Sequence, residues 1–184
     1  AYLRKKGIEE SYCRYFHPLL EKARILWQTG SLSRAQEQFI RNTIRQIIIL
    51  EDNLLKPWTG KFKSAVAMIN TSDNLSDNNF LFYKYTLKKR GYDVIFTGGI
   101  LPASEVIEIY KIKPFDFLIV NSSAFDFARK RIGYFDSIGK SLMIRKIILT
   151  DSPETIDRKS GDKLVIIRDP IRFIKYFDGL NKQS

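Results

Sequence analysis

The chain has 184 residues, of which 44% are hydrophobic, and it carries a formal net charge of +11. This length suits one mid-sized domain, or a small domain with a helical attachment, and the apolar content is sufficient for a hydrophobic core. No apolar run approaches the roughly 20 residues of a membrane span, and the N-terminal AYLRKKGIEE lacks the apolar run of a signal peptide. We therefore expect a globular, cytoplasmic protein that contacts no membrane.

The single cysteine and the single histidine limit the possible metal chemistry. Cys13 has no second cysteine for an internal disulfide, and Cys13 and His17 together cannot supply the ligands of a structural zinc site. The chain also lacks a G-x-S-x-G sequence and a phosphate-binding glycine loop. We therefore expect no metal site and no enzymatic activity.

The positive charge is compatible with two kinds of surface. Basic proteins attract phosphate backbones and anionic surfaces. Here, however, Lys and Arg are spread over the whole chain, in LRKK, LKKR, FARKRIG and MIRK. Such a distribution fits a nucleic-acid-associated protein and a basic solvated surface equally well.

Two amphipathic helices are predicted between residues 8 and 55. Gly30 suits the C-terminal cap of the first helix, and Ser33 with Gln36 forms a capping box for the second. These signals predict an antiparallel helical pair. The apolar residues with helical spacing are Ile8, Tyr12, Tyr15, Phe16, Leu19, Leu20, Ala23, Leu26, Trp27, Phe39, Ile40, Ile44, Ile47 and Ile48.

After KPWTGKFK the pattern changes to short apolar runs that alternate with helical segments. This alternation predicts βαβ units and a five-stranded parallel sheet of flavodoxin-like or Rossmann-like order 2-1-3-4-5. The fold class is therefore α/β, with a helical bundle over residues 1–58 and a Rossmann-like domain over residues 59–184. The predicted strands are 64–70, 92–98, 116–121, 144–150 and 163–169, and the predicted helices are 77–90, 102–112, 123–139, 153–159 and 170–179.

Two stretches together resemble a known family. LWQTGSLSRAQEQFIRNTIRQ, followed by LKKRGYDVIFTGGILPASEVIEIYKIKPFDFLIVNSS, resembles the cobalamin (B12)-binding sensor module of MerR-type transcriptional regulators. Trp27, nine residues, and then Glu37-Gln38 match a bundle motif of that family, and Gly98-Gly99 match its glycine turn. The resemblance implies a bundle packed over the carboxyl ends of the strands, and an effector domain whose DNA-binding helix-turn-helix lies upstream of Ala1.

The same alignment places different residues where that family holds its cofactor. The position of the lower cobalt ligand, a histidine in the family, falls on Ser76, and the last glycine of that loop falls on Asn79. The Gly-Gly pair after the fourth strand falls on Thr150-Asp151, and the upper-face histidine falls on Gln38. The resemblance therefore implies that His-ligated cobalamin binding is lost, because a serine hydroxyl is a poor cobalt ligand. We expect no cofactor, with cobalamin retained as the alternative ligand.

Most of these residues also have a structural interpretation. Trp27 on an amphipathic helix is typical of a core residue, and Glu37 in a first helical turn complements the helix dipole. Gly98-Gly99 can shape a turn, and Ser122 and Ser123 can cap the following helix or bind an anion there. His17 precedes Pro18 within a helical pattern, which predicts a kink.

Two other functions are compatible with the same pattern. One is a cobalamin sensor or corrinoid carrier that binds without an axial histidine. The other is a receiver-like signalling domain, in which Asp73, Asp77 and Asp151 would hold magnesium. A receiver, however, needs acidic residues at the ends of its first and third strands and a lysine at the end of its fifth. Those positions are here Asn70, Asn121 and Arg168.

The second helix predicts self-association. Phe39, Ile40, Ile44, Ile47 and Ile48 give it more apolar surface than a two-helix bundle can cover. We therefore expect a second copy of the chain, or helices of a longer parent, to cover part of it. The predicted partners are a second copy of this chain and, through the upstream helix-turn-helix, DNA.

Overall fold

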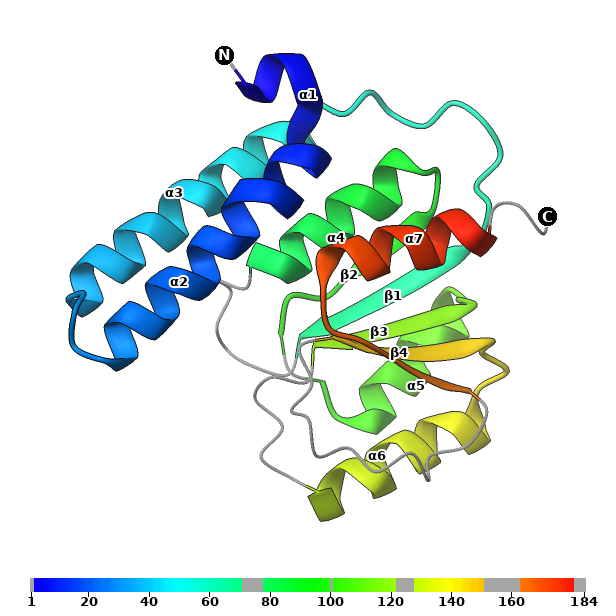
Figure 1. Ribbon diagram of the computed structural model, residues 1–184. Coiled ribbons are helices and arrows are strands. Elements are labelled where there is room, and N and C mark those ends of the chain that lie inside the picture. The colour runs from blue at the N-terminus through cyan, green and yellow to red at the C-terminus, as the bar shows by residue number, and fades with distance from the viewer. Residues whose placement is uncertain (1, 71–77, 100, 122–127, 151–162, 181–184) are drawn as a thin grey trace.

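The computed structural model describes residues 2–70, 78–99, 101–121, 128–150 and 163–180. A parallel sheet lies between two layers of helices, and the N-terminal helices pack on the outside of one of these layers (Figure 1). None of the described helices is both long and apolar enough to cross a membrane.

The sheet has the predicted strand order. Its five strands lie in the order β2-β1-β3-β4-β5, and every neighbouring pair is parallel. The runs that predicted strands are nearly continuous in apolar residues because the central strands are buried on both faces. The strands are β1 (Ala65–Asn70), β2 (Asp93–Phe96), β3 (Phe117–Asn121), β4 (Lys146–Thr150) and β5 (Leu164–Ile167).

Four helices cover the two faces of the sheet. The first face, with Val66 and Met68, packs against α4 (Asn78–Lys89) and α7 (Pro170–Leu180). The second face, with Ala67 and Ile69, packs against α5 (Ala103–Ile112) and α6 (Ala128–Ser141). This alternation is the two-residue period of strand side chains. The predicted helix at 153–159 lies outside the described residues.

The N-terminal region forms the predicted antiparallel pair, with irregular backbone at Gly7 and in a π-helical turn. The pair consists of α1 (Tyr2–Ser11), the π-helical turn η1 (Tyr12–Phe16) and α2 (His17–Gln28) on one side, and α3 (Arg34–Asn53) on the other. Gly30 has φ +76°, and Ser33 and Gln36 form the capping box, as predicted. The π turn ends where the backbone N–H of His17 donates to the carbonyl of Tyr12. Pro18 follows with no N–H to donate, which accounts for the irregularity predicted at this point.

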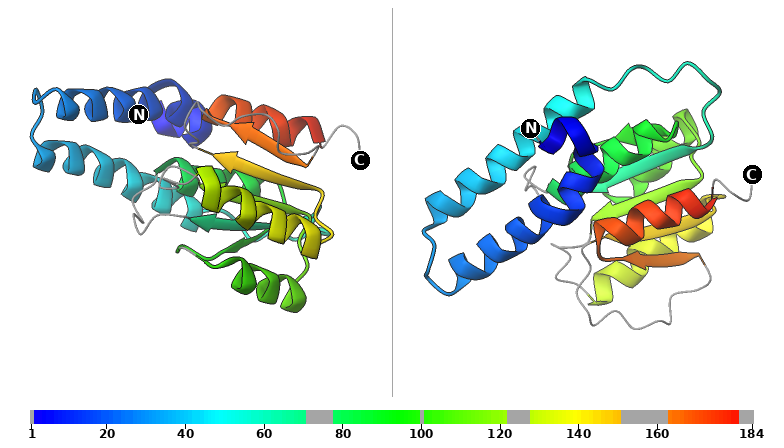
Figure 2. Two further views of the ribbon diagram at one scale, coloured as in Figure 1. Left: turned by 90° about the horizontal axis from the view of Figure 1, so that it is seen from below. Right: turned by 45° about the horizontal axis from the view of Figure 1, so that its top comes forward.

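The position of the pair differs from the prediction. We expected it to lie over the carboxyl ends of the strands. It instead packs along α4, and the ends of α2 and α3 nearest their connecting turn extend beyond the strand ends (Figures 1 and 2). The reason is that α4 is buried on both sides, so it serves as a central layer. Tyr12 stacks on Phe82 of α4 with ring centroids 4.0 Å apart, and Asn78 Nδ2 donates to the carbonyl of Arg41 at 3.0 Å.

The pair and the sheet share one hydrophobic core. Tyr12 and Ile44 from the pair belong to the same buried cluster as Met68 of β1 and Phe173 of α7. The predicted boundary at residues 58 and 59 falls within the linker between Asn53 and Ala65. The division into two domains stays a prediction.

The indole ring of Trp58 packs the linker between α3 and β1 against the turn after α4. Trp58 lies against Gly91, where an added Cβ would be 2.5 Å from the ring, and its Nε1 donates to the carbonyl of Lys61 at 3.2 Å. Gly91 also has φ +78°, which favours glycine. Two independent constraints therefore require glycine at this position.

Gly91→Ala is expected to lower the free energy of unfolding by about 1–3 kcal/mol, since it adds backbone strain and displaces Trp58. Trp58→Ala in the same chain should recover the steric part of that loss and leave the backbone part. Gly139→Ala, on α6 with nothing within 4 Å of its added Cβ, is the matched control and should be neutral or slightly stabilising. Urea unfolding of the four proteins measures these differences, and an equal effect at positions 91 and 139 would contradict the account.

Candidate functional site

Three buried polar residues lie side by side at the carboxyl ends of the central strands. Asn70 of β1 is in register with Asn121 of β3, and Asn121 is in register with Thr150 of β4. All three are buried, and they continue the strand face that packs against α4 and α7. Burying polar groups costs free energy unless they are hydrogen-bonded, so this row is a marked exception in an apolar sheet.

The turns that follow these strands are the predicted binding region. Ser76, Ser122, Ser123 and Asp151 lie outside the described residues, as do Asp73 and Asp77 of the receiver interpretation. Gly98 has φ +71°, which agrees with its role in shaping the turn after β2. Gly99 has open space where a side chain would stand.

Asn79 faces the helical pair. Its Oδ1 accepts from the hydroxyl of Tyr12 at 2.8 Å and lies 3.1 Å from Nδ1 of His17. The side chain of Asn79 therefore joins α4 to η1 and α2.

The three candidate residues of the helical pair differ in their surroundings. Trp27, in the last turn of α2, is 42% exposed, so the core interpretation of this residue was wrong. Glu37 is buried in the first turn of α3, where its carboxylate accepts from Arg41, which is a stronger constraint than the helix dipole alone. Gln38 follows it, partly buried. Trp27 and Glu37 therefore lie near the α2–α3 turn, the part of the pair that projects beyond the carboxyl ends of the strands (Figure 2).

A small cavity lies between the pair and the start of α4. Its volume is about 60 Å³, and His17, Arg24, Arg41 and Asn79 are among the residues around it. Asn78 also lines it, and the buried Oδ1 of Asn78 has no hydrogen-bond partner. The cavity has room for ordered water, because one water needs about 10–15 Å³ of such space. It is far too small for a large cofactor.

Sequence reasoning did not select Asn70 and Asn121 as site residues. Their signal was present, because each ends a continuous apolar run, SAVAMIN and DFLIVN. The contacts of Tyr12 and His17 with Asn79 had no such signal, since the partners are 67 and 62 residues apart in the chain.

Comparison with solved structures identifies the fold. The monomethylamine corrinoid protein of Methanosarcina barkeri is similar over 88% of this chain and 78% of its own, with a TM-score of 0.64 and 10% identity. A chain of the methanol:cobalamin methyltransferase complex MtaBC from the same organism matches 99% of this chain and 71% of its own, with a TM-score of 0.50 and 12% identity. A cobalamin-binding protein from Desulfitobacterium hafniense DCB-2 matches 93% of this chain and 82% of its own, with a TM-score of 0.42 and 12% identity.

The protein therefore has the fold of a cobalamin-binding domain, a Rossmann-like α/β sheet preceded by helices. At 10% and 12% identity, the likeness concerns the fold alone. No protein-family model matches the sequence, and a search of curated proteins finds no significant match.

The described residues do not fit a cobalamin whose cobalt is held by a protein imidazole. His17 is the only histidine of the chain, and it is bound to Asn79 beside the 60 Å³ cavity. Thr150, aligned with a glycine of the resembling family, is fully buried at the end of β4. In the described part of the site, β4 thus ends in a threonine rather than a glycine, and the one imidazole of the chain is at the junction with the helical pair.

Proposed function

We propose that this chain is the effector domain of a MerR-type transcriptional regulator in which His-ligated cobalamin binding has been lost. A helix-turn-helix domain upstream of this chain would contact DNA, and this domain would act through self-association or through a different ligand. The observation that carries the proposal is the position of His17, because the only imidazole in the chain serves the junction of η1, α2 and α4. The regulatory part rests on the sequence resemblance.

The exposed apolar residues of the pair support self-association. Ile44 and Ile48 of α3 are buried within the chain, whereas Phe39 on the same helix is 73% exposed. Phe39 and Ile40 also border a shallow apolar hollow near the α2–α3 turn. An exposed phenyl group beside other apolar side chains gives a second copy of the chain a surface to cover.

We expect the protein to form dimers or larger assemblies at tens of micromolar. Phe39→Ser should shift these assemblies toward monomers, because Phe39 is the most exposed aromatic residue among the described residues of the helical pair. Analytical ultracentrifugation measures the effect. Ile112→Ser is the matched control, because Ile112 is 85% exposed on α5 and lies on the other face of the sheet. A monomeric wild-type protein, or an equal response of both variants, would contradict self-association through α3.

A second candidate function is favoured by Trp27. An indole that is 42% exposed near the projecting turn is available to a ligand, as the cobalamin sensor or corrinoid carrier without an axial histidine requires. The visible spectrum of protein purified from cobalamin-fed cells separates the two candidates. A red protein would favour the second, whereas a colourless protein with another bound small molecule, found by mass spectrometry, would favour the first.

A further inference from the structure

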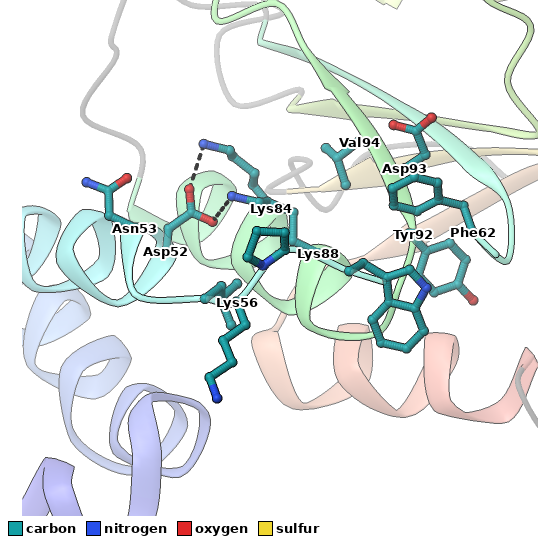
Figure 3. A pocket seen from close by; sticks show the side chains of 12 residues that line it. Asp52, Asn53, Lys56, Phe62, Lys84, Lys88, Tyr92, Asp93 and Val94 are labelled. Atoms are coloured by element: carbon teal, nitrogen blue, oxygen red, sulfur yellow. Dashed lines mark hydrogen bonds and ion pairs between the residues drawn. The ribbon is translucent and has the colours of Figure 1, made fainter. Parts of the chain in front are cut away.

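A larger hollow lies at the outer edge of β2, away from the site at the carboxyl ends of the strands. Its volume is about 580 Å³, within the range of about 300–1,000 Å³ that is typical of small-molecule sites. Its walls come from the end of α3, the linker, the second half of α4 and the beginning of β2 (Figure 3). Because the start of β2 forms one wall, the hollow lies toward the amino ends of the strands.

One carboxylate in this hollow holds two ammonium groups. Nζ of Lys84 is 2.9 Å from one oxygen of Asp52, and Nζ of Lys88 is 2.7 Å from the other. Burial raises the pKa of Asp52, but the hydrogen bonds and charges of the two lysines outweigh it, so the pKa lies below its ordinary value. Asp52 is thus ionised at neutral pH, and the three groups together carry one excess positive charge.

The other charged residues of the hollow do not cancel this excess. Lys56 on the linker adds a further cation. Asp93 is the remaining acid among the lining residues, and its carboxylate is 2.6 Å from Nζ of Lys113. A partly buried excess of positive charge attracts an anion more strongly than an exposed lysine does, because the surrounding dielectric constant is lower.

Aromatic rings form the apolar part of the hollow. One side of the Trp58 indole lies against Gly91, and its Nε1 is bound to the carbonyl of Lys61, so the ring is held in place. Trp58 and Phe62 nevertheless remain 43% and 48% exposed, and Tyr92 completes this wall. A fixed, exposed indole is a platform on which a flat ring can stack.

We propose that this hollow binds a planar aromatic anion of mononucleotide size, with its ring on Trp58 and its anionic group at Lys84 and Lys88. A nucleoside monophosphate has this chemistry, whether it is free or at the end of a nucleic acid strand. The site is independent of cobalamin and of the proposed function, because it uses no residue at the carboxyl ends of the strands.

The test uses AMP as the probe and a chain carrying Trp27→Phe, so that Trp58 is the only tryptophan. We expect AMP to quench the fluorescence in a saturable manner with a submillimolar midpoint, and Lys84→Gln with Lys88→Gln to raise that midpoint at least about fivefold, since the anion contact is lost. Lys111→Gln, which removes one lysine from α5 on the other face of the sheet, is the control for the loss of a lysine remote from the hollow. If the double variant fails to fold, Lys56→Gln tests the same electrostatic contribution.

Smaller and larger probes separate the contribution of the aromatic ring from that of the anionic group. Adenosine and ribose 5-phosphate should each bind more weakly than AMP, since each lacks one of the two contacts. A single-stranded adenine oligonucleotide that binds more tightly, with the same dependence on the lysines, would identify a nucleic acid strand as the source of the nucleotide. The proposal is overturned by the absence of saturable quenching, by an equal response to inorganic phosphate and AMP, or by equal midpoints for the Lys84/Lys88 variant and the Lys111→Gln control.

Discussion

Methylcobalamin added to the purified protein is expected to keep the spectrum of a corrinoid without a protein imidazole on its cobalt. The reason is that coordination needs a neutral imidazole nitrogen directed at the metal, and His17 is bound to Asn79 at the junction of the helical pair and α4. Releasing it would break the contact with the partly buried Asn79, whose Oδ1 would keep the hydrogen bond from Tyr12, at a cost of about 0.5–1.5 kcal/mol. Titration followed by visible spectroscopy measures both the affinity and the ligand of the cobalt.

Two variants make this prediction sharper. Ser76→His alone should not create tight binding, because the full side chain of Thr150 remains at the end of β4. Ser76→His together with Thr150→Gly and Asp151→Gly restores the family's residues at these positions and should bind more tightly than the single variant. A wild-type dissociation constant below about 1 µM, with an imidazole-ligated spectrum that His17→Gln abolishes, would contradict the proposed loss.

The sheet could be predicted because its signal is local. The run from Val66 to Asn70 is buried on both faces, so every residue before the final asparagine is apolar, and the same is true of Phe117 to Val120 before Asn121. Helical patterns between these runs indicate that each helix connects two parallel strands. Since such connections are right-handed, few strand orders of the sheet are possible. The strand order 2-1-3-4-5 could therefore be predicted from the sequence.

The site was less predictable because it depends on which surfaces meet. Helical periodicity placed Trp27 on the same stripe as Leu20 and Ala23, which are buried, but it could not show that α2 extends beyond its partners at Trp27. Likewise, alignment gave a position to Asn79 but no direction to its side chain. The packing of the pair along α4 determines both the exposure of Trp27 and the direction of the Asn79 side chain. That packing depends on contacts between residues far apart in the chain.

Tyr12→Ala is expected to give a large loss of stability, about 3–5 kcal/mol in the free energy of unfolding, as for other large aromatic residues of a core. Tyr12 is fully buried, its ring stacks on Phe82 at 4.0 Å, and its hydroxyl donates to Asn79 at 2.8 Å. The substitution therefore removes both an apolar contact and a polar contact between η1 and α4. Urea unfolding followed by circular dichroism measures the loss.

Two further variants show which contact matters and whether burial is the cause. Tyr12→Phe keeps the ring and removes the hydroxyl, so it should cost about 1 kcal/mol. Tyr15→Ala, in the same π turn but 51% exposed, should cost far less than Tyr12→Ala because little of its ring leaves water on folding. Since Tyr12 belongs to the core that includes Met68 of β1 and Phe173 of α7, the helices and the sheet should lose stability in a single transition. If Tyr12→Ala unfolds the helical pair and leaves the sheet with unchanged stability, the helices and the sheet are not one cooperative unit, and the core they share does not couple them.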